Sequence, residues 1–301
     1  MIYSIDPAFE QRLNEVADRI TVALDQLIPP ASGPEAQLMR AMRHGALSKG
    51  KRLRPFITIE VGRMFGAPEK ALLRGAAAVE CMHAYSLIHD DLPCMDDDDF
   101  RRGQPTVHKA FDEATAVLAG DALQALAFEI MVSPETHRDA LMRCKLVERL
   151  AIASGARGMV GGQMIDMTGS DSDEDALLAA TRMQRLKTGA LIAFSLEAGA
   201  IMGRASQEAR QALHRFAQDL GLAFQIADDL MDVTGSAEDA GKSVGKDAGR
   251  GKTNFVTLLG VDGAQARLRL LGDQSRSHLA IFGARAKTLA QSVDFVINRR
   301  V

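Results

Sequence analysis

The chain has 301 residues, of which 47% are hydrophobic and 25% charged, and its formal net charge is −3. This composition can build a sizeable core, and it argues against a general nucleic-acid binder, because such proteins usually carry a strong basic excess. Cys81, Cys94 and Cys144 are too few and too scattered for a disulfide framework, and no paired Cys/His spacing suggests zinc, so a reducing compartment is favoured.

The amino terminus, MIYSIDPAFEQRL, has no basic flank followed by an apolar stretch. We therefore expect neither secretion nor a membrane span, and we expect a cytoplasmic protein. No linker or composition break divides the chain, which favours one domain. Apolar residues recur at helical spacing, without strand-like alternation, over residues 71–88, 114–132, 145–160, 174–202 and 208–233. The pattern predicts an all-α fold.

The first marked segment is GKRLRP, from Gly50 to Pro55, which places three positive charges just ahead of an apolar helix. Taken alone, so short a basic run indicates only a charged surface patch. It becomes informative together with the acidic and basic clusters that follow it.

The helix expected over residues 71–88 leads into the segment LIHDDLPCMDDDDFRRGQPT. Pro93 lacks an amide donor and disfavours helix at the residue before it, so we expect the helix to end or distort there. Before that break, His83 and Asp90 are spaced to share one helix face. The run of aspartates from Asp96 to Asp99 would by itself indicate a solvated surface.

Several cations complement the acidic segment. Arg101 and Arg102 follow it directly, and the planar fork of arginine matches phosphate oxygens in pairs, whereas lysine acts as a movable point charge. Further along the chain come Lys187-Thr188-Gly189 and then Lys242, Lys246 and Lys252 in a glycine-rich stretch. Each of these lysines is ordinary when considered alone.

A second carboxylate cluster, Asp228-Asp229-Leu-Met-Asp232, lies within the helix expected over residues 208–233. At about 100° per residue, Asp228 and Asp232 lie within about 40° of each other, so two like charges share one face of an apolar helix. Buried carboxylates take up protons or require cations. Magnesium suits hard oxygen ligands and commonly bridges carboxylates to substrate phosphates. The two clusters therefore predict a phosphorylated substrate.

Together these features resemble the trans-isoprenyl diphosphate synthase family. Three motifs carry the resemblance: GKRLRP at Gly50 to Pro55, DDLPCMD at Asp90 to Asp96 leading into RRG, and QIADDLMD at Gln225 to Asp232. Weaker support comes from GGQMIDM at Gly161 to Met167, KTG at Lys187 to Gly189, and GKSVGKDAGRGK at Gly241 to Lys252. The two-residue insertion in the first acidic motif is similar to the short-chain bacterial farnesyl diphosphate synthase branch, although geranylgeranyl enzymes share it.

The resemblance implies a bundle of roughly ten or more helices around a deep central cavity, as one polyprenyl synthase domain over residues 1–301, and a homodimer. It implies a prenyltransferase that condenses isopentenyl diphosphate with dimethylallyl and geranyl diphosphate to give farnesyl diphosphate. The implied steps are magnesium-assisted ionisation, attack by the alkene and loss of a proton. The cofactor would be a cluster of about three magnesium ions, with manganese as an alternative.

The resemblance also assigns roles by position within the motifs. The metal ligands would be Asp90, Asp96 and Asp228, and the groups that hold metal-bound waters or orient lysines would be Asp91, Asp166, Asp229, Asp232 and Asp247. The allylic diphosphate would be held by Arg101, Lys187, Lys242 and Lys252, and isopentenyl diphosphate by Gly50, Lys51, Arg54, His83 and Arg102. The catalytic candidates are Lys187, Thr188 and Gln225, the last two steadying the cation through oxygen dipoles.

Product length is the least determined property. Tyr85 lies about 7.5 Å before Asp90 along a helix, where a bulky aromatic limits chain growth in related enzymes, although tyrosine is also a common helix-packing residue. A geranylgeranyl or geranyl diphosphate synthase therefore stays an alternative.

Two other classes share parts of the pattern. A class I terpene cyclase would need no second diphosphate cradle, so Lys51, Arg54 and His83 argue against it. A non-catalytic regulatory subunit would be expected to have lost one acidic cluster, and this chain retains both. The chain departs from the family pattern at Thr253-Asn254-Phe255-Val256, where a tyrosine-proline pair is common, and in the poorly marked stretch from Val261 to Val301.

Overall fold

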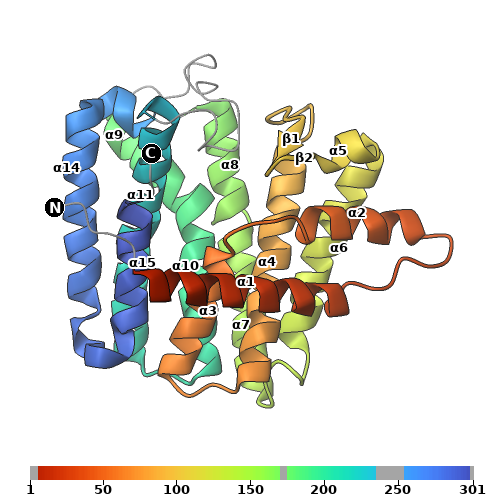
Figure 1. The fold of residues 1–301 in the computed structure, drawn as a ribbon, viewed down its shortest axis with the longest axis horizontal. Helices are drawn as coiled ribbons and strands as arrows, with labels where there is room; N and C mark the ends of the chain where they lie inside the picture. Colours follow the sequence, from red (N-terminus) through yellow and green to blue (C-terminus); the bar gives the residue numbers. More distant parts are fainter. Residues whose placement is uncertain (1–5, 170–174, 235–253, 299–301) are drawn as a thin grey trace.

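The structure is a computed structural model that describes residues 6–169, 175–234 and 254–298. These residues fold almost entirely into helices, which confirms the expected all-α class (Figure 1). The α-helices are α1 (Pro7–Leu27), α2 (Ala36–Ala46), α3 (Leu53–Met64), α4 (Glu69–Asp90), α5 (Val107–Ala110), α6 (Glu113–Val132), α7 (Ala140–Ser154), α8 (Met159–Thr168), α9 (Ala176–Gln184), α10 (Ala190–Met202), α11 (Gln207–Thr234), α14 (Phe255–His278) and α15 (Lys287–Ile297).

Four short elements interrupt this pattern. A π-helical turn, Arg185–Gly189, joins α9 to α10, and a 3₁₀ segment, Ala280–Ala286, joins α14 to α15. Strands β1 (Phe100–Arg101) and β2 (Gln104–Pro105) form a small antiparallel hairpin after α4. The sequence showed no alternating pattern that would reveal strands of only two residues each.

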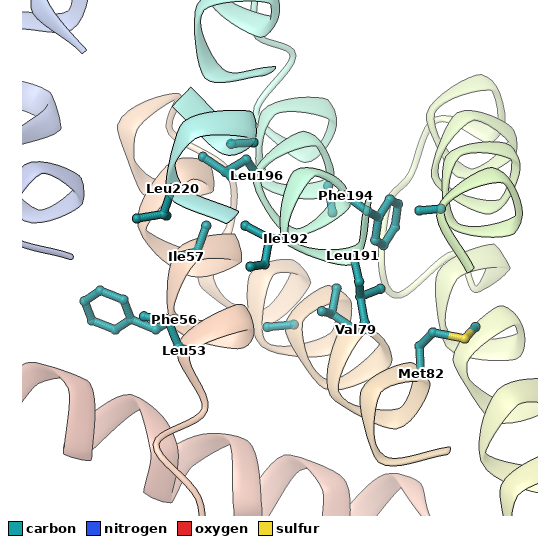
Figure 2. Close-up of a cluster of buried hydrophobic side chains, with 14 of the residues drawn as sticks. Leu53, Phe56, Ile57, Val79, Met82, Leu191, Ile192, Phe194, Leu196 and Leu220 are labelled. Atoms are coloured by element: carbon teal, nitrogen blue, oxygen red, sulfur yellow. The ribbon is translucent and has the colours of Figure 1, made fainter. Parts of the chain in front are cut away.

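The helices form a bundle in which α1 and α2 lie across the other helices (Figure 1). Its core lies where α3, α4, α10 and α11 meet. Figure 2 shows the interdigitating side chains, which come from these four helices and include Phe56, Val79, Ile192 and Leu220. Because α10 is buried nearly all round, its sequence is apolar without a polar stripe, as expected for a central helix.

The predicted helix boundaries hold at α4, α6 and α11 and fail over residues 145–160. Helix α4 ends at Asp90, with Asp91 as its C-cap, just ahead of Pro93. The expected helix over residues 145–160 instead ends at Ser154, and α8 begins separately at Met159. Gly155 and Gly158 lie in the break, and at Gly158 a Cβ would lie 2.1 Å from the Ala153 carbonyl oxygen. The apolar period continued through these glycines, so it predicted one helix where there are two.

Helix α6 is the one helix of the described residues that is long and apolar enough to cross a membrane, judged by length and composition alone. In the structure 50% of this stretch is buried within the bundle, and the core helix of a soluble protein passes the same test. Its inward face includes Leu123, Ala127 and Ile130. Packing within the bundle therefore explains why the inward face of α6 is apolar.

Candidate active site

A cavity of about 720 Å³ opens between α4, α8, α10, α11 and the π-helical turn. Its apolar wall includes Met95, Met159, Met164, Leu191 and Phe224. The predicted site residues that line it are Arg54, His83, Tyr85, Asp90, Arg101, Arg102, Lys187, Thr188, Gln225 and Asp228. Residues from both acidic motifs therefore meet at one cavity, as the sequence predicted.

Asp90 occupies the end of α4, and the chain then folds back so that the Asp96 amide donates to the Asp90 carbonyl oxygen at 2.8 Å. Burial raises the pKa of the Asp90 carboxyl to about 6, and nearby Lys187 opposes the shift while Asp96 adds to it. An unusually basic carboxylate in a cavity indicates a group whose charge needs a cation.

Asp91, predicted to support the site from outside, is 3% exposed and holds Arg101. The Arg101 Nε donates to Asp91 Oδ1 at 2.8 Å and to Oδ2 at 2.9 Å, and Arg101 Nη2 lies 2.6 Å from Oδ1. Because Arg101 also lines the cavity, this contact fixes the direction in which its guanidinium enters.

A second group of cations lies at the cavity beside α3. Arg54 Nη1 is 3.3 Å from His83 Nε2, and burial together with the surrounding arginines holds the pKa of His83 well below its usual value. The imidazole is therefore neutral near pH 7 and can accept a hydrogen bond from Arg54. Arg102 Nη1 donates to Ser48 Oγ at 3.3 Å. A Cβ on Gly50 would lie 2.7 Å from the Arg102 guanidinium carbon, so glycine leaves room for Arg102 there.

Lys51, predicted to bind the same diphosphate, is exposed and does not line the cavity. Its Nζ lies 5.0 Å from the centroid of the Phe295 ring on α15, within the range of a cation–π contact. Helix α15 thus contacts the GKRLRP segment through Lys51.

Arg52 is a residue whose role the sequence did not reveal. It is 4% exposed, has left-handed backbone (φ 48°) and forms an ion pair with Glu80, which is 1% exposed. Its Nη2 also donates to the carbonyl oxygens of Ala46 and Ser48, both at 2.7 Å. Three positive charges within four residues resembled one surface patch, but Arg52 is buried and fixes the segment that carries Lys51 and Arg54.

The π-helical turn supplies Lys187 and Thr188. Lys187 Nζ forms an ion pair with Asp166 Oδ2 on α8 at 2.7 Å. A Cβ on Gly162 would lie 2.2 Å from the Lys187 amide nitrogen, so the glycine of GGQMIDM permits α8 to approach the turn this closely. An extra residue in a helical turn of this kind often marks a functional site.

Thr188 connects the turn to α11. Its Oγ1 lies 3.2 Å from Gln225 Oε1 and 3.1 Å from Gln184 Oε1. Gln225 Nε2 in turn donates to Asp229 Oδ1 at 2.9 Å, while Asp229 Oδ2 accepts from the Phe255 amide at 2.8 Å. Asp229, 5% exposed, therefore orients Gln225 and fixes the start of α14 beside α11.

The positions of the predicted metal ligands can be compared with what a magnesium cluster requires. Asp90 and Asp228 face one cavity, as ligands of a shared cluster should. The predicted trio with Asp96 is not a close group: the described residues that place three ligand atoms within 4.8 Å of one another are Asp97, Asp99 and His108. Wide spacing suits magnesium, which binds through one or two carboxylates and completes its shell with water and phosphate oxygens.

The other predicted residues fall in two groups. Asp232 lies half-buried on α11, one turn beyond Asp228. Lys242, Asp247 and Lys252 lie outside the described residues.

Comparisons with known proteins agree with this geometry. The polyprenyl synthetase family model matches residues 35–280. The chain is 42% identical to the farnesyl diphosphate synthase of Escherichia coli (strain K12), over 97% of this chain and 99% of that protein. It is 37% identical to the heterodimeric geranylgeranyl pyrophosphate synthase large subunit 2 of Arabidopsis thaliana, over 97% and 77%. The crystal structure of an FPP/GFPP synthase from Zymomonas mobilis superposes with a TM-score of 0.87 at 45% identity, covering 96% of this chain and 99% of that one.

Proposed function

Because this chain belongs to the polyprenyl synthetase family, we propose that it is a (2E,6E)-farnesyl diphosphate synthase. It condenses isopentenyl diphosphate with dimethylallyl diphosphate and then with geranyl diphosphate, releasing diphosphate at each step. The observation that carries this proposal is that Asp90 and Asp228, which lie far apart in the sequence on α4 and α11, line one cavity. Arg54, His83 and Lys187 line the same cavity.

The two diphosphates bind in separate places. Arg101 and Lys187 hold the allylic diphosphate, together with Lys242 and Lys252, and this role is supported by the charge interaction of both Arg101 and Lys187 with Asp90. Arg54, His83 and Arg102, which line the cavity, hold isopentenyl diphosphate together with Gly50 and Lys51 from the adjoining segment. Separate cradles let one diphosphate leave while the other stays attached to its carbon chain.

Family membership implies a divalent metal. We assign magnesium, about three ions per site, to Asp90, Asp96 and Asp228, with manganese as an alternative. When bound, the ions supply positive charge to the diphosphate as it departs.

The chain's own residues do the rest. Arg101 and Lys187 hold the leaving diphosphate in place, the methionine-rich wall excludes water, and the oxygens of Thr188 and Gln225 direct their dipoles at the developing allylic cation. We assign the proton that the new carbon chain loses to the released diphosphate.

Farnesyl diphosphate is the assigned product because Tyr85, 8% exposed, lines the cavity one and a half helical turns before Asp90. Similarity to a geranylgeranyl pyrophosphate synthase keeps a twenty-carbon product as the alternative. A terpene cyclase or a regulatory subunit is disfavoured, since the Arg54–His83 group would serve no second diphosphate in the former and both acidic clusters would be unneeded in the latter.

We further propose a cytoplasmic homodimer that binds neither nucleic acid nor membrane. The outward face of α6 supports the dimer, because Val117, Leu118 and Val132 are 40%, 57% and 52% exposed on one apolar helix. Exposed apolar side chains, here Val117 beside Leu118 with Val132 about four turns further along α6, favour association. Free cysteines and a net charge of −3 suit the cytoplasm and argue against polyanion binding.

One incubation tests the function. Purified protein, magnesium and labelled isopentenyl diphosphate are combined with dimethylallyl or geranyl diphosphate, and product length is measured by chromatography. We expect fifteen-carbon product from both primers, and none when EDTA is added. A dominant twenty-carbon product would replace the farnesyl assignment, and a cyclised hydrocarbon or no condensation at all would contradict the proposal.

A further inference from the structure

Tyr85 does not stand alone against the cavity, because His89 packs on it from the next turn of α4. The two ring centroids are 5.0 Å apart and the ring planes lie at 80°, an edge-to-face contact. Both residues line the cavity. Edge-to-face pairs are directional and resist rotation of either ring, so His89 restricts where the Tyr85 ring can lie.

His89 is itself held by α6. Its Nε2 donates to the Val117 carbonyl oxygen at 3.0 Å, which defines both the tautomer and the direction of the ring. The imidazole lies in the space where a Cβ at Gly120, on the same turn of α6, would otherwise be. A main-chain acceptor on a neighbouring helix is a rigid anchor.

Gly120 is the position that makes this contact possible. A Cβ at Gly120 would lie 2.1 Å from His89 Nε2 and 2.4 Å from its Cδ2, so any side chain there would push the imidazole away from α6. The ring therefore lies between Tyr85 on one side and the bare backbone of α6 on the other. Gln124, also on α6, hydrogen-bonds the Tyr85 side chain, and the charge of Asp121 on the same helix acts on Tyr85.

We propose that His89 is a positioning residue for product length: it is braced against α6 at Gly120 and holds the Tyr85 ring at the depth where chain growth stops. This inference rests on the proposed function and deepens it, because it assigns the length limit to a pair of residues and a glycine on another helix. Tyr85 touches the growing chain, and His89 acts through Tyr85.

Two substitutions should move product length in opposite directions. His89→Ala removes the edge contact and leaves room beside α6, so Tyr85 can withdraw and the cavity deepens. Gly120→Ala drives the imidazole off α6 toward Tyr85 and the cavity, which becomes shallower. We expect the ratio of twenty- to fifteen-carbon product to rise roughly two- to tenfold in the first variant, the factor that an aromatic pair contact supports. In the second, the ten- to fifteen-carbon ratio should rise by a similar factor.

The double variant His89→Ala/Gly120→Ala separates this mechanism from a general disturbance of α6. Without the imidazole, the new methyl group at residue 120 has nothing to push, so its products should match those of His89→Ala. Gly75→Ala is the matched control, because its Cβ would meet the Met202 side chain at 2.7 Å, and Met202 does not line the cavity. It should lower the melting temperature without changing product length.

Comparing the products of wild type and variants distinguishes failure of this inference from failure of the proposed function. If the wild-type protein makes farnesyl diphosphate and both single variants keep its product distribution, the inference is wrong while the function stands. Shortening by Gly120→Ala that persists in the double variant would also overturn it, since α6 itself would then set the depth. If His89→Ala fails to fold, His89→Asn at the same position supplies the lengthening test, because its side chain is shorter and has no ring to pack against Tyr85.

Discussion

Thr188 Oγ1 lies 3.2 Å from Gln225 Oε1, and this contact joins the π-helical turn to α11 at the wall of the cavity. The two residues come from motifs 37 positions apart in the chain. Gln225 is in turn held by Asp229, so the Gln225 side chain is oriented from the side away from Thr188.

Thr188→Val keeps the shape of the side chain and removes its hydroxyl. Because the hydroxyl dipole acts on charge that develops during ionisation, we expect kcat to fall roughly tenfold or more while KM for isopentenyl diphosphate stays within about twofold. Steady-state kinetics with geranyl diphosphate measures both constants. Thr21→Val on α1 is the control, since Thr21 only bonds its own helix at Ala17. An unchanged kcat in Thr188→Val would remove Thr188 from the catalytic assignment.

Asp90→Asn should raise the free energy of unfolding of the metal-free protein, although it removes a proposed metal ligand. The pKa of Asp90 is raised to about 6, above its unfolded value, so the folded protein favours the protonated form and the buried charge costs stability above pH 6. We expect the metal-free variant to be more stable than wild type by about 3 kcal/mol at pH 8, with the difference shrinking as pH falls from 6 toward 4. Urea unfolding in EDTA measures this.

The same variant, and Asp228→Asn, should lose magnesium-dependent turnover. Asp18→Asn, an exposed aspartate on α1, should change neither stability nor activity. Near-normal activity in Asp90→Asn or Asp228→Asn would contradict their assignment as metal ligands.

His83→Gln should make the protein less sensitive to mild acid. The pKa of folded His83 is held well below 6.5 by burial and by Arg54, so below pH 6.5 the unfolded chain binds more protons and wild-type stability falls as pH falls. Glutamine does not titrate, and the slope between pH 6.5 and 5 should be shallower by up to about 1.4 kcal/mol per pH unit. The control Gln211→Asn replaces an exposed, non-titrating residue on α11 and should keep the wild-type slope. Equal slopes in His83→Gln and wild type would show that His83 titrates alike in both states.

Arg52→Met would leave Glu80 buried without its partner. Breaking a buried ion pair in this way costs about 3–5 kcal/mol, so we expect a large drop in the free energy of unfolding and a higher KM for isopentenyl diphosphate. Adding Glu80→Gln should restore part of the stability. Arg12→Met is the control, because its partner Glu60 also pairs with Arg63. A loss no larger than that of the control would mean that the Arg52 pair contributes little.

Much of this site could be predicted from local pattern. Pro93 indicated the end of α4, and the seven-residue spacing of His83 and Asp90 placed both side chains on the face that now lines the cavity. The apolar setting of Asp228 correctly indicated that its carboxylate faces an interior space. In each case the relevant neighbours lie within two helical turns, where periodicity is informative.

The rest depends on contacts between distant segments. Arg52 looked like its neighbours because its partner, Glu80, lies on another helix, and the clearance that Gly120 leaves for His89 is visible only once α4 and α6 are packed. Asp229 bonds the Phe255 amide, a link across 26 residues that no spacing rule encodes. The π-helical turn escaped notice because one additional residue barely alters an apolar period in so hydrophobic a stretch.

That turn has a consequence for how this protein can change over evolution. One residue more than an ordinary helix turn needs is accommodated at Arg185–Gly189, between α9 and α10. Because the turn accommodates its extra residue as a local bulge, deleting any single residue there would restore a regular helix, keep α9 and α10 in phase, and remove the widened turn that presents Lys187 and Thr188 to the cavity. Homologous chains should therefore vary in amino-acid identity within this stretch more readily than they gain or lose a residue in it.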